Sequence, residues 1–242
     1  MTEHIMKAFD SDLQGLGLLI SEMGGLAEKQ VIDSIGALGK YDTALAQRVV
    51  ADDAKIDALQ HDIENRAVMT LARRQPMAID LREIVAALRI SNDLERIGDL
   101  AKNIAKRVNA LAGGFHLPQV TRGIEHMTDM VLTQLKTVLD SYARRDSAAA
   151  MTVWRGDEQI DSVNNSLFRE LLTYMMEQPR NIGVCIHLVF CAKNIERMGD
   201  HATNIAETVY YMIEGRKLTD ERPKGDTTSE TRIPPSAERR SS

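Results

Sequence analysis

The 242 residues are enough for one large domain or two of ordinary size. Aromatic residues make up only 4% of the chain and β-branched runs are scarce, which indicates an all-α protein. A net charge of −5 argues against nucleic acid as a partner, and the absence of a signal peptide and of a long apolar run predicts a cytoplasmic protein without a membrane span.

Apolar residues recur at helical spacing through the first half of the chain. The pattern predicts three helices, over about 5–38, 43–75 and 77–112. Pro76 closes the second helix, because proline disfavours helical geometry in the residue before it, and Gly113-Gly114 stops the third. We therefore expect a first three-helix bundle over residues 1–113.

The second half follows the same plan. Its helices are expected over about 119–144, 147–177 and 180–215. Short connections favour antiparallel neighbours, so the prediction is two tandem antiparallel three-helix bundles with six long helices, the second bundle spanning 117–215. Residues 216–242 are nearly free of apolar side chains, and we expect a disordered tail there.

The third and sixth predicted helices carry one motif twice. The twelve residues from Glu95 to Lys106 read ERIGDLAKNIAK, and the segment 101 residues later reads ERMGDHATNIAE, with eight positions identical. An internal repeat of this length indicates one structural unit made twice.

The acidic residues of the motif fall on one side of its helix. At 100° per residue, Glu95, Asp99 and Asn103 share a stripe roughly opposite the apolar residues, so we expect the stripe to point away from the core. The second copy repeats it with Glu196, Asp200 and Asn204.

A second acidic pair lies on the preceding helix of each bundle. Asp53 and Asp57 stand four residues apart, and so do Asp157 and Asp161. On the helical wheel each pair lies beside the core, where the neighbouring helix can face it. Four carboxylates should therefore meet in each bundle.

Such a group of oxygens is suited to hard or borderline divalent cations such as Mg²⁺, Mn²⁺ or Fe. Without a cation the carboxylates repel one another. A single acidic pair is usually a solvated helix face, but the recurrence of both pairs favours a metal site, with Asn103 and Asn204 as further ligands. We expect an exposed cluster, not a buried cavity.

Other motif residues have simpler roles. Gly98 and Gly199 should allow a neighbouring helix to come close. Arg96 and Arg197 should pair with acidic neighbours, or else contact an anion. His201 lies at the border of the apolar face, and we expect it to pack there, with a role at the metal site as the alternative.

The two cysteines, Cys185 and Cys191, lie in an apolar run of the last predicted helix. Six residues of helix rise by about 9 Å, which is too far for a disulfide bond. Both are expected to be reduced thiols that pack in the interior, rather than zinc or redox sites.

The doubled Glu-Arg-x-Gly-Asp-x-Ala-x-Asn-Ile motif, with an upstream Asp-x-x-x-Asp, resembles the PhoU family of phosphate-specific transport system accessory proteins over about residues 5–215. The resemblance implies multinuclear iron or zinc clusters on the bundle surface. We call Asp53, Asp57, Glu95 and Asp99 the first carboxylate set. The second carboxylate set is Asp157, Asp161, Glu196 and Asp200.

The same resemblance implies a dimeric, non-enzymatic negative regulator of the phosphate-starvation response. It would act between the ATPase subunit of a phosphate ABC transporter and a phosphate-sensing histidine kinase. A metal-dependent phosphohydrolase and a metal-free helical adaptor are the alternatives. Asn194 stands where the first copy has Asp93, so the two sites need not be equally occupied.

Overall fold

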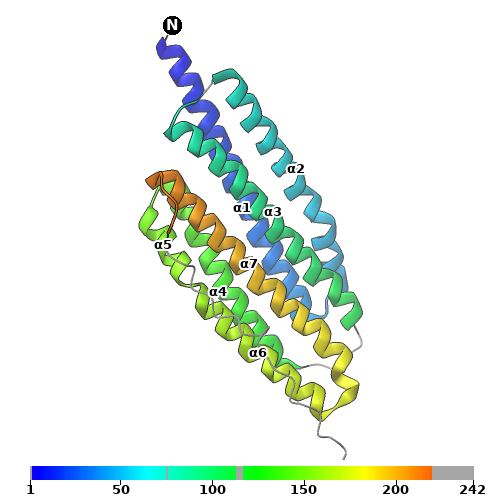
Figure 1. Cartoon of the computed structure of the whole chain (residues 1–242). Coiled ribbons are helices and arrows are strands. Elements are labelled where there is room, and N and C mark those ends of the chain that lie inside the picture. Colours follow the sequence, from blue (N-terminus) through cyan, green and yellow to red (C-terminus); the bar gives the residue numbers. More distant parts are fainter. Residues whose placement is uncertain (1, 75, 113–116, 220–242) are drawn as a thin grey trace, which may run out of the picture.

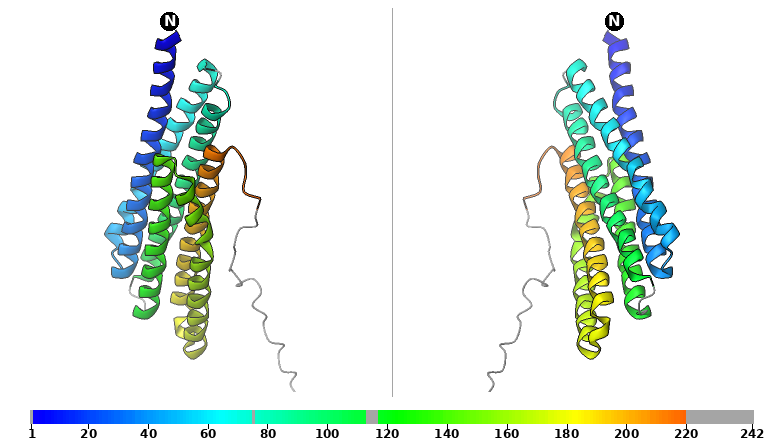
Figure 2. Two further views of the ribbon diagram at one scale, coloured as in Figure 1. Left: turned by 90° about the vertical axis from the view of Figure 1, so that its left-hand side faces the viewer. Right: turned by 90° about the vertical axis from the view of Figure 1, so that its right-hand side faces the viewer.

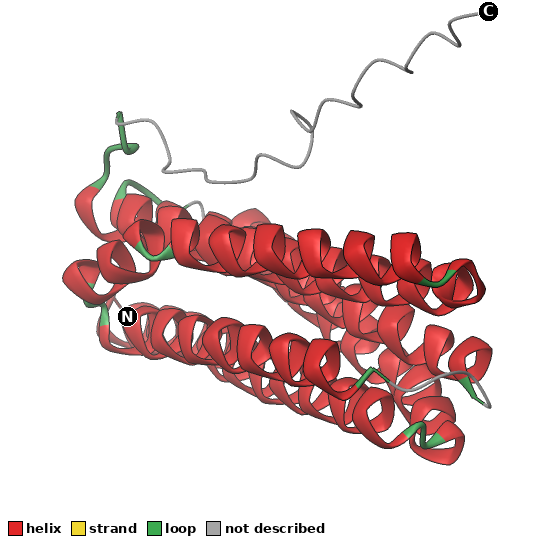
Figure 3. Ribbon diagram, turned by 90° about the horizontal axis from the view of Figure 1, so that it is seen from below, coloured by secondary structure: helices red, strands yellow, loops and turns green. Residues whose placement is uncertain are grey.

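The computed structural model describes residues 2–74, 76–112 and 117–219, and these form helices and no strands (Figures 1 and 3). The elements are α1 (Thr2–Lys40), α2 (Thr43–Arg74), α3 (Ile79–Leu111), α4 (Pro118–Arg144), α5 (Ser147–Arg155), α6 (Asp157–Glu177), the 3₁₀ turn η1 (Pro179–Asn181) and α7 (Ile182–Glu214). The all-α prediction is confirmed. The Gly113-Gly114 helix stop and the tail after residue 219 lie outside the described residues.

The helix expected over 147–177 is two helices instead. α5 ends at Arg155, and α6 begins at Asp157, with Gly156 as the break between them. The Gln134 amide nitrogen comes within 3.2 Å of the place where a Cβ of Gly156 would lie. The break puts Asp157 in the first turn of α6, where the helix dipole favours a carboxylate.

The antiparallel helices α3 and α7 lie side by side at the centre of the molecule (Figure 1). α1 and α2 pack against α3, while α4, α5 and α6 pack against α7. The N-terminal end of α1 extends beyond the second group of helices (Figure 2). Each copy of the repeated motif therefore lies on a central helix that contacts both its own bundle and the other.

The apolar sides of both motif copies are buried, as the helical wheel predicts. Those of α3 are Leu94, Ile97, Leu100, Ile104 and Val108. Those of α7 are Ile195, Met198, Ala202, Ile205 and Val209. Burial of these residues on both central helices fixes the rotation of α3 and α7, and with it the direction of their acidic stripes.

Both cysteines are buried and unpaired, which confirms the prediction of reduced, packed thiols. Burial raises the pKa of the Cys191 thiol to about 12. None of the helices in the described part of the chain has the combined length and apolarity that crossing a bilayer requires.

Candidate functional site

Two glycines bring the motif helices close to their neighbours. A Cβ on Gly98 would lie 2.9 Å from Cδ1 of Ile56 and 3.5 Å from Oδ1 of Asp53, both on α2. A Cβ on Gly199 would lie 3.0 Å from Cδ1 of Ile160 on α6. A side chain at either position would have to displace Ile56 or Ile160, so the expected close approach is confirmed in both bundles.

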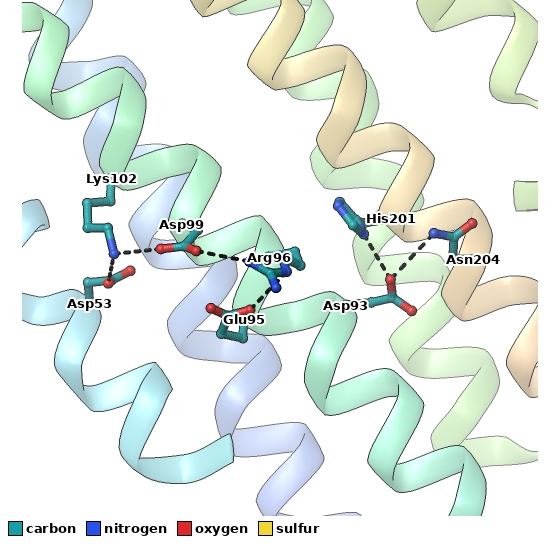
Figure 4. A network of polar contacts seen from close by, with 8 residues as sticks. All are labelled: Asp53, Asp93, Glu95, Arg96, Asp99, Lys102, His201 and Asn204. Atoms are coloured by element: carbon teal, nitrogen blue, oxygen red, sulfur yellow. Dashed lines mark hydrogen bonds and ion pairs between the residues drawn. The ribbon is translucent and has the colours of Figure 1, made fainter. Parts of the chain in front are cut away.

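In the first carboxylate set, Asp53 is the buried member, with 4% of its surface exposed. The ammonium group of Lys102 contacts both Asp53 Oδ2 and Asp99 Oδ1 (Figure 4). The amide of Gln30 on α1 donates to Asp53 Oδ1 over 2.9 Å and to the Gly98 carbonyl oxygen over 3.3 Å. A lysine and a glutamine thus satisfy a carboxylate that three helices enclose.

Burial and nearby charges together shift the pKa values of Glu95 and Asp99 in this set. Arg96 lies 3.4 Å from Glu95 Oε2 and 3.6 Å from Asp99 Oδ2, which confirms the expected ion pairs. Burial and the nearby Asp99 charge raise the pKa of Glu95. Burial also acts to raise the pKa of Asp99, but the hydrogen bond and the charge of Lys102 bring that pKa below its ordinary value. Asp57 is half-buried beside Glu95.

The second carboxylate set is more deeply buried. Asp157, Asp161 and Glu196 are buried, and Asp200 is half-buried. The Lys193 ammonium donates to Glu196 Oε1 over 2.8 Å, whereas Glu196 Oε2 is buried without a hydrogen-bond partner. Burial raises the pKa of Glu196; the Lys193 contact opposes this, and the charges of Asp200 and Asp161 add to it.

The expectation of an exposed acidic stripe is wrong for Glu196, of which only 5% is exposed. The expectation of an exposed stripe fits the first bundle better, since 30% of the Asp99 side chain is exposed. The helical wheel treats one helix at a time and says nothing of what covers its outer side. Here α6 approaches α7 closely at Gly199 and covers that part of the stripe.

Within the described ranges, no three His, Cys, Asp or Glu side chains gather in an arrangement that would hold a metal ion. Asn103 is exposed, and Asn204 faces α3. The metal sites therefore stay a prediction. The second set fits a hard cation in its chemistry, because its donors are oxygens and the buried Glu196 Oε2 has no hydrogen bond to lose.

A polar contact that the sequence did not indicate joins the two bundles. Asp93 on α3 is buried, and its Oδ1 lies 2.8 Å from Nδ1 of His201 and 3.5 Å from Nδ2 of Asn204 on α7 (Figure 4). The His201 tautomer that has its proton on Nδ1 can donate to this carboxylate oxygen. His201 thus has a polar partner in the opposite bundle. The sequence does contain one sign of this contact: Asp93 and His201 both differ from their counterparts in the repeat, Asn194 and Leu100.

Residues 20–108 and 124–209 match the model of the PhoU domain. The chain belongs to the PhoU family. The PhoU homolog of Rhizobium meliloti (strain 1021), described as a phosphate-specific transport system accessory protein, is 58% identical over 93% of this chain and 95% of its own length. That of Caulobacter vibrioides (strain NA1000 / CB15N), described in the same words, is 50% identical over 95% of this chain and all of its own length.

Solved PhoU structures share the fold. The crystal structure of PhoU from Pseudomonas aeruginosa superimposes with a TM-score of 0.83 at 38% identity, over 86% of this chain and 100% of that one. The phosphate transport system regulatory protein PhoU from Streptococcus pneumoniae gives 0.81 at 26% identity, over 87% and 99%. The helical architecture and the two PhoU domains therefore agree with the family.

In this PhoU-family chain, His201→Leu should lower the free energy of unfolding by about 1.5 kcal/mol, because it leaves the buried Asp93 carboxylate without its main partner. Leucine is the residue that the first copy has at this position. Urea denaturation measures the loss. Adding Asp93→Asn, the residue of the second copy, should recover about half of it, because a neutral amide costs less to bury. Additive losses in the double variant would contradict the pairing.

Proposed function

We propose that this chain is a cytoplasmic, dimeric negative regulator of the phosphate-starvation response. It acts between the ATPase subunit of a phosphate ABC transporter and a phosphate-sensing histidine kinase. The observation that carries the proposal is the match along nearly the whole chain to a phosphate-specific transport system accessory protein at 58% identity. The family relative from Streptococcus pneumoniae, a phosphate transport system regulatory protein, supports the regulatory part.

Each carboxylate set in this proposal binds a divalent or iron-type cation, with Fe, Zn, Mn and Mg as the candidates. The cation supplies positive charge to carboxylates that otherwise repel one another. Asp53 and Asp57 of α2 would share it with Glu95 and Asp99 of α3 in the first bundle. In the second bundle the buried Oε2 of Glu196, which has no hydrogen-bond partner, supports a site where a cation could bind.

The mode of action in this proposal is binding rather than catalysis. An apolar stripe runs along the first turns of α7, where Ile182, Ile186 and Phe190 are spaced four residues apart and are 41–48% exposed. Apolar side chains that stand together on a helix surface favour contact with another protein. This stripe supports an adaptor that meets partner proteins or a second copy.

Complementation tests the proposal. The gene for this chain is placed in a Rhizobium meliloti strain that lacks its own 58% identical relative, and a phosphate-starvation reporter is measured at high phosphate. We expect repression to return with the unchanged chain and with the control Glu158→Gln, an exposed acidic residue of α6. Glu196→Gln combined with Asp200→Asn should fail to repress.

The outcomes distinguish the regulator from the metal-free adaptor and the phosphohydrolase. No repression by the unchanged chain would overturn the regulator. Full repression by the Glu196/Asp200 variant would leave a metal-free adaptor in the place of a metal-dependent one. Sustained turnover of phosphate esters by the purified protein, lost in that variant, would favour the phosphohydrolase. Sedimentation equilibrium measures the dimer separately.

A further inference from the structure

A cavity lies between the facing sides of α6 and α7, and none of its lining residues belongs to a carboxylate set. The lining residues share one side of each helix and are Asn164, Phe168 and Leu171 on α6 and Val189, Ala192 and Lys193 on α7. Ala192 is buried between the two helices and leaves space because its side chain is a single methyl group. We call this space the α6–α7 cavity.

The walls of the α6–α7 cavity are mainly apolar. Leu171 and Ala192 are buried, while Phe168 and Val189 are half-buried, so these four side chains offer carbon to an occupant. The volume of the cavity is about 240 Å³. An apolar cavity of about 150 Å³ is enough to bind benzene. The α6–α7 cavity can therefore hold one ring with a substituent.

Asn164 supplies a polar group to this apolar wall. Only 3% of the residue is exposed, and within the described ranges no other group hydrogen-bonds to its carboxamide. A buried polar group without a partner costs about 1–3 kcal/mol. The partner of Asn164 therefore comes from whatever fills the cavity, and an amide can both donate and accept.

Lys193 brings charge to the edge of the cavity. Its side chain is 42% exposed, and its ammonium donates to Glu196 Oε1 over 2.8 Å. A positive and a negative group therefore lie together at this edge. A charged ligand would be attracted by one of them and repelled by the other, which favours an uncharged occupant.

The corresponding place in the first bundle is more polar. When α6 is aligned with α2 on their acidic pairs, Phe168 corresponds to Glu64, whose side chain is 49% exposed. When the motifs of α7 and α3 are aligned, Ala192 corresponds to Ser91. The apolar lining is thus particular to the second bundle.

We propose that the α6–α7 cavity binds a small uncharged ring compound that carries one hydroxyl or amide group. The ring packs against the apolar walls, and its polar group pairs with the Asn164 carboxamide. This site goes beyond the proposed function and does not depend on it, because neither a metal nor a partner protein takes part. Phenol is a suitable probe, and toluene has the same shape with a methyl group in place of the hydroxyl.

Titration of the full chain with phenol, followed by two-dimensional NMR, tests the proposal. We expect saturable shifts with a Kd of about 1 mM, which is usual for a ligand of so few atoms. Asn164→Leu nearly keeps the size of the side chain and removes its hydrogen bond. The ratio of the toluene Kd to the phenol Kd should fall about fivefold in this variant, as expected for the loss of one hydrogen bond.

Two variants that fill the cavity locate the site. Ala192→Leu and Val189→Phe each place carbon in the cavity and should abolish phenol binding. Ala110→Leu makes the same change as the first of them at an exposed position of α3 and should leave the Kd unchanged. Circular dichroism checks that each variant is folded.

Phenol binding that does not saturate, or that persists in either filled variant when it is folded, would overturn the proposal. An unchanged ratio of the toluene Kd to the phenol Kd in Asn164→Leu would also overturn it, because the polar group would then not pair with the amide. That comparison does not need the filled variants, so it decides the matter even if both of them unfold.

Discussion

Asp53→Ala should lower the free energy of unfolding by about 3 kcal/mol in chelator-treated protein. The substitution removes a side chain of which only 6% is exposed, and it takes a partner from both Lys102 and Gln30. The cost comes mainly from the groups left behind, since an ammonium and an amide that are held inside three helices each lose one of two acceptors. Urea denaturation followed by circular dichroism measures it.

Asp52→Ala is the matched control, because Asp52 is the preceding residue of α2 and makes an ion pair of the common exposed kind. Its side chain is 48% exposed and lies 2.7 Å from Lys55. Loss of this pair should cost less than about 0.5 kcal/mol. Equal losses in the two variants would mean that burial of Asp53 adds nothing, contrary to the enclosed site described above.

Gly98→Leu should destabilise the protein by about 3 kcal/mol, the upper end of the usual cost of overpacking. The first added carbon already lies 2.9 Å from Ile56, and the rest of the side chain has to push α2 away from α3. The shift also separates Asp53 from Lys102, so packing and ion pairing are lost together. The midpoint of urea denaturation reports the change.

Gly25→Leu tests the same substitution where space is open. Gly25 lies inside α1, is exposed, and would have no atom within 4 Å of an added Cβ. Leucine is a better helix former than glycine, so this variant should gain up to about 0.8 kcal/mol. Opposite signs at the two glycines are the expected result. A loss at Gly25 as large as that at Gly98 would show that the effect is not close helix packing.

The helices and their buried sides were predictable because they depend on local periodicity. Leu94 and Ile97, for example, are buried on α3 as the wheel requires. The break at Gly156 was not predictable in this way, since apolar residues continue across it at helical spacing. Glycine is tolerated inside other helices of this chain, such as Gly98 in α3 and Gly199 in α7, so its presence alone does not mark an end.

The candidate site was predictable where the two motif copies agree and missed where they differ. Glu196 and Asp200 could be predicted as site residues because Glu95 and Asp99 match them. Lys102 was passed over because its counterpart is threonine, although it is the cation that holds two acidic residues of the first set. Burial of Glu196 was missed for another reason. It depends on a second helix, and the periodicity of one helix does not show which other helix packs against it.

The contact between Asp93 and His201 limits what each half of this duplicated chain can still do alone. α3 lies antiparallel to α7, so a first bundle paired with another copy of itself in the same way would put Leu100 where His201 now lies. The buried Asp93 would then face an apolar side chain, at a cost that the intact chain avoids. The Asp93–His201 pair therefore makes the two halves complementary, so that neither half replaces the other at this contact.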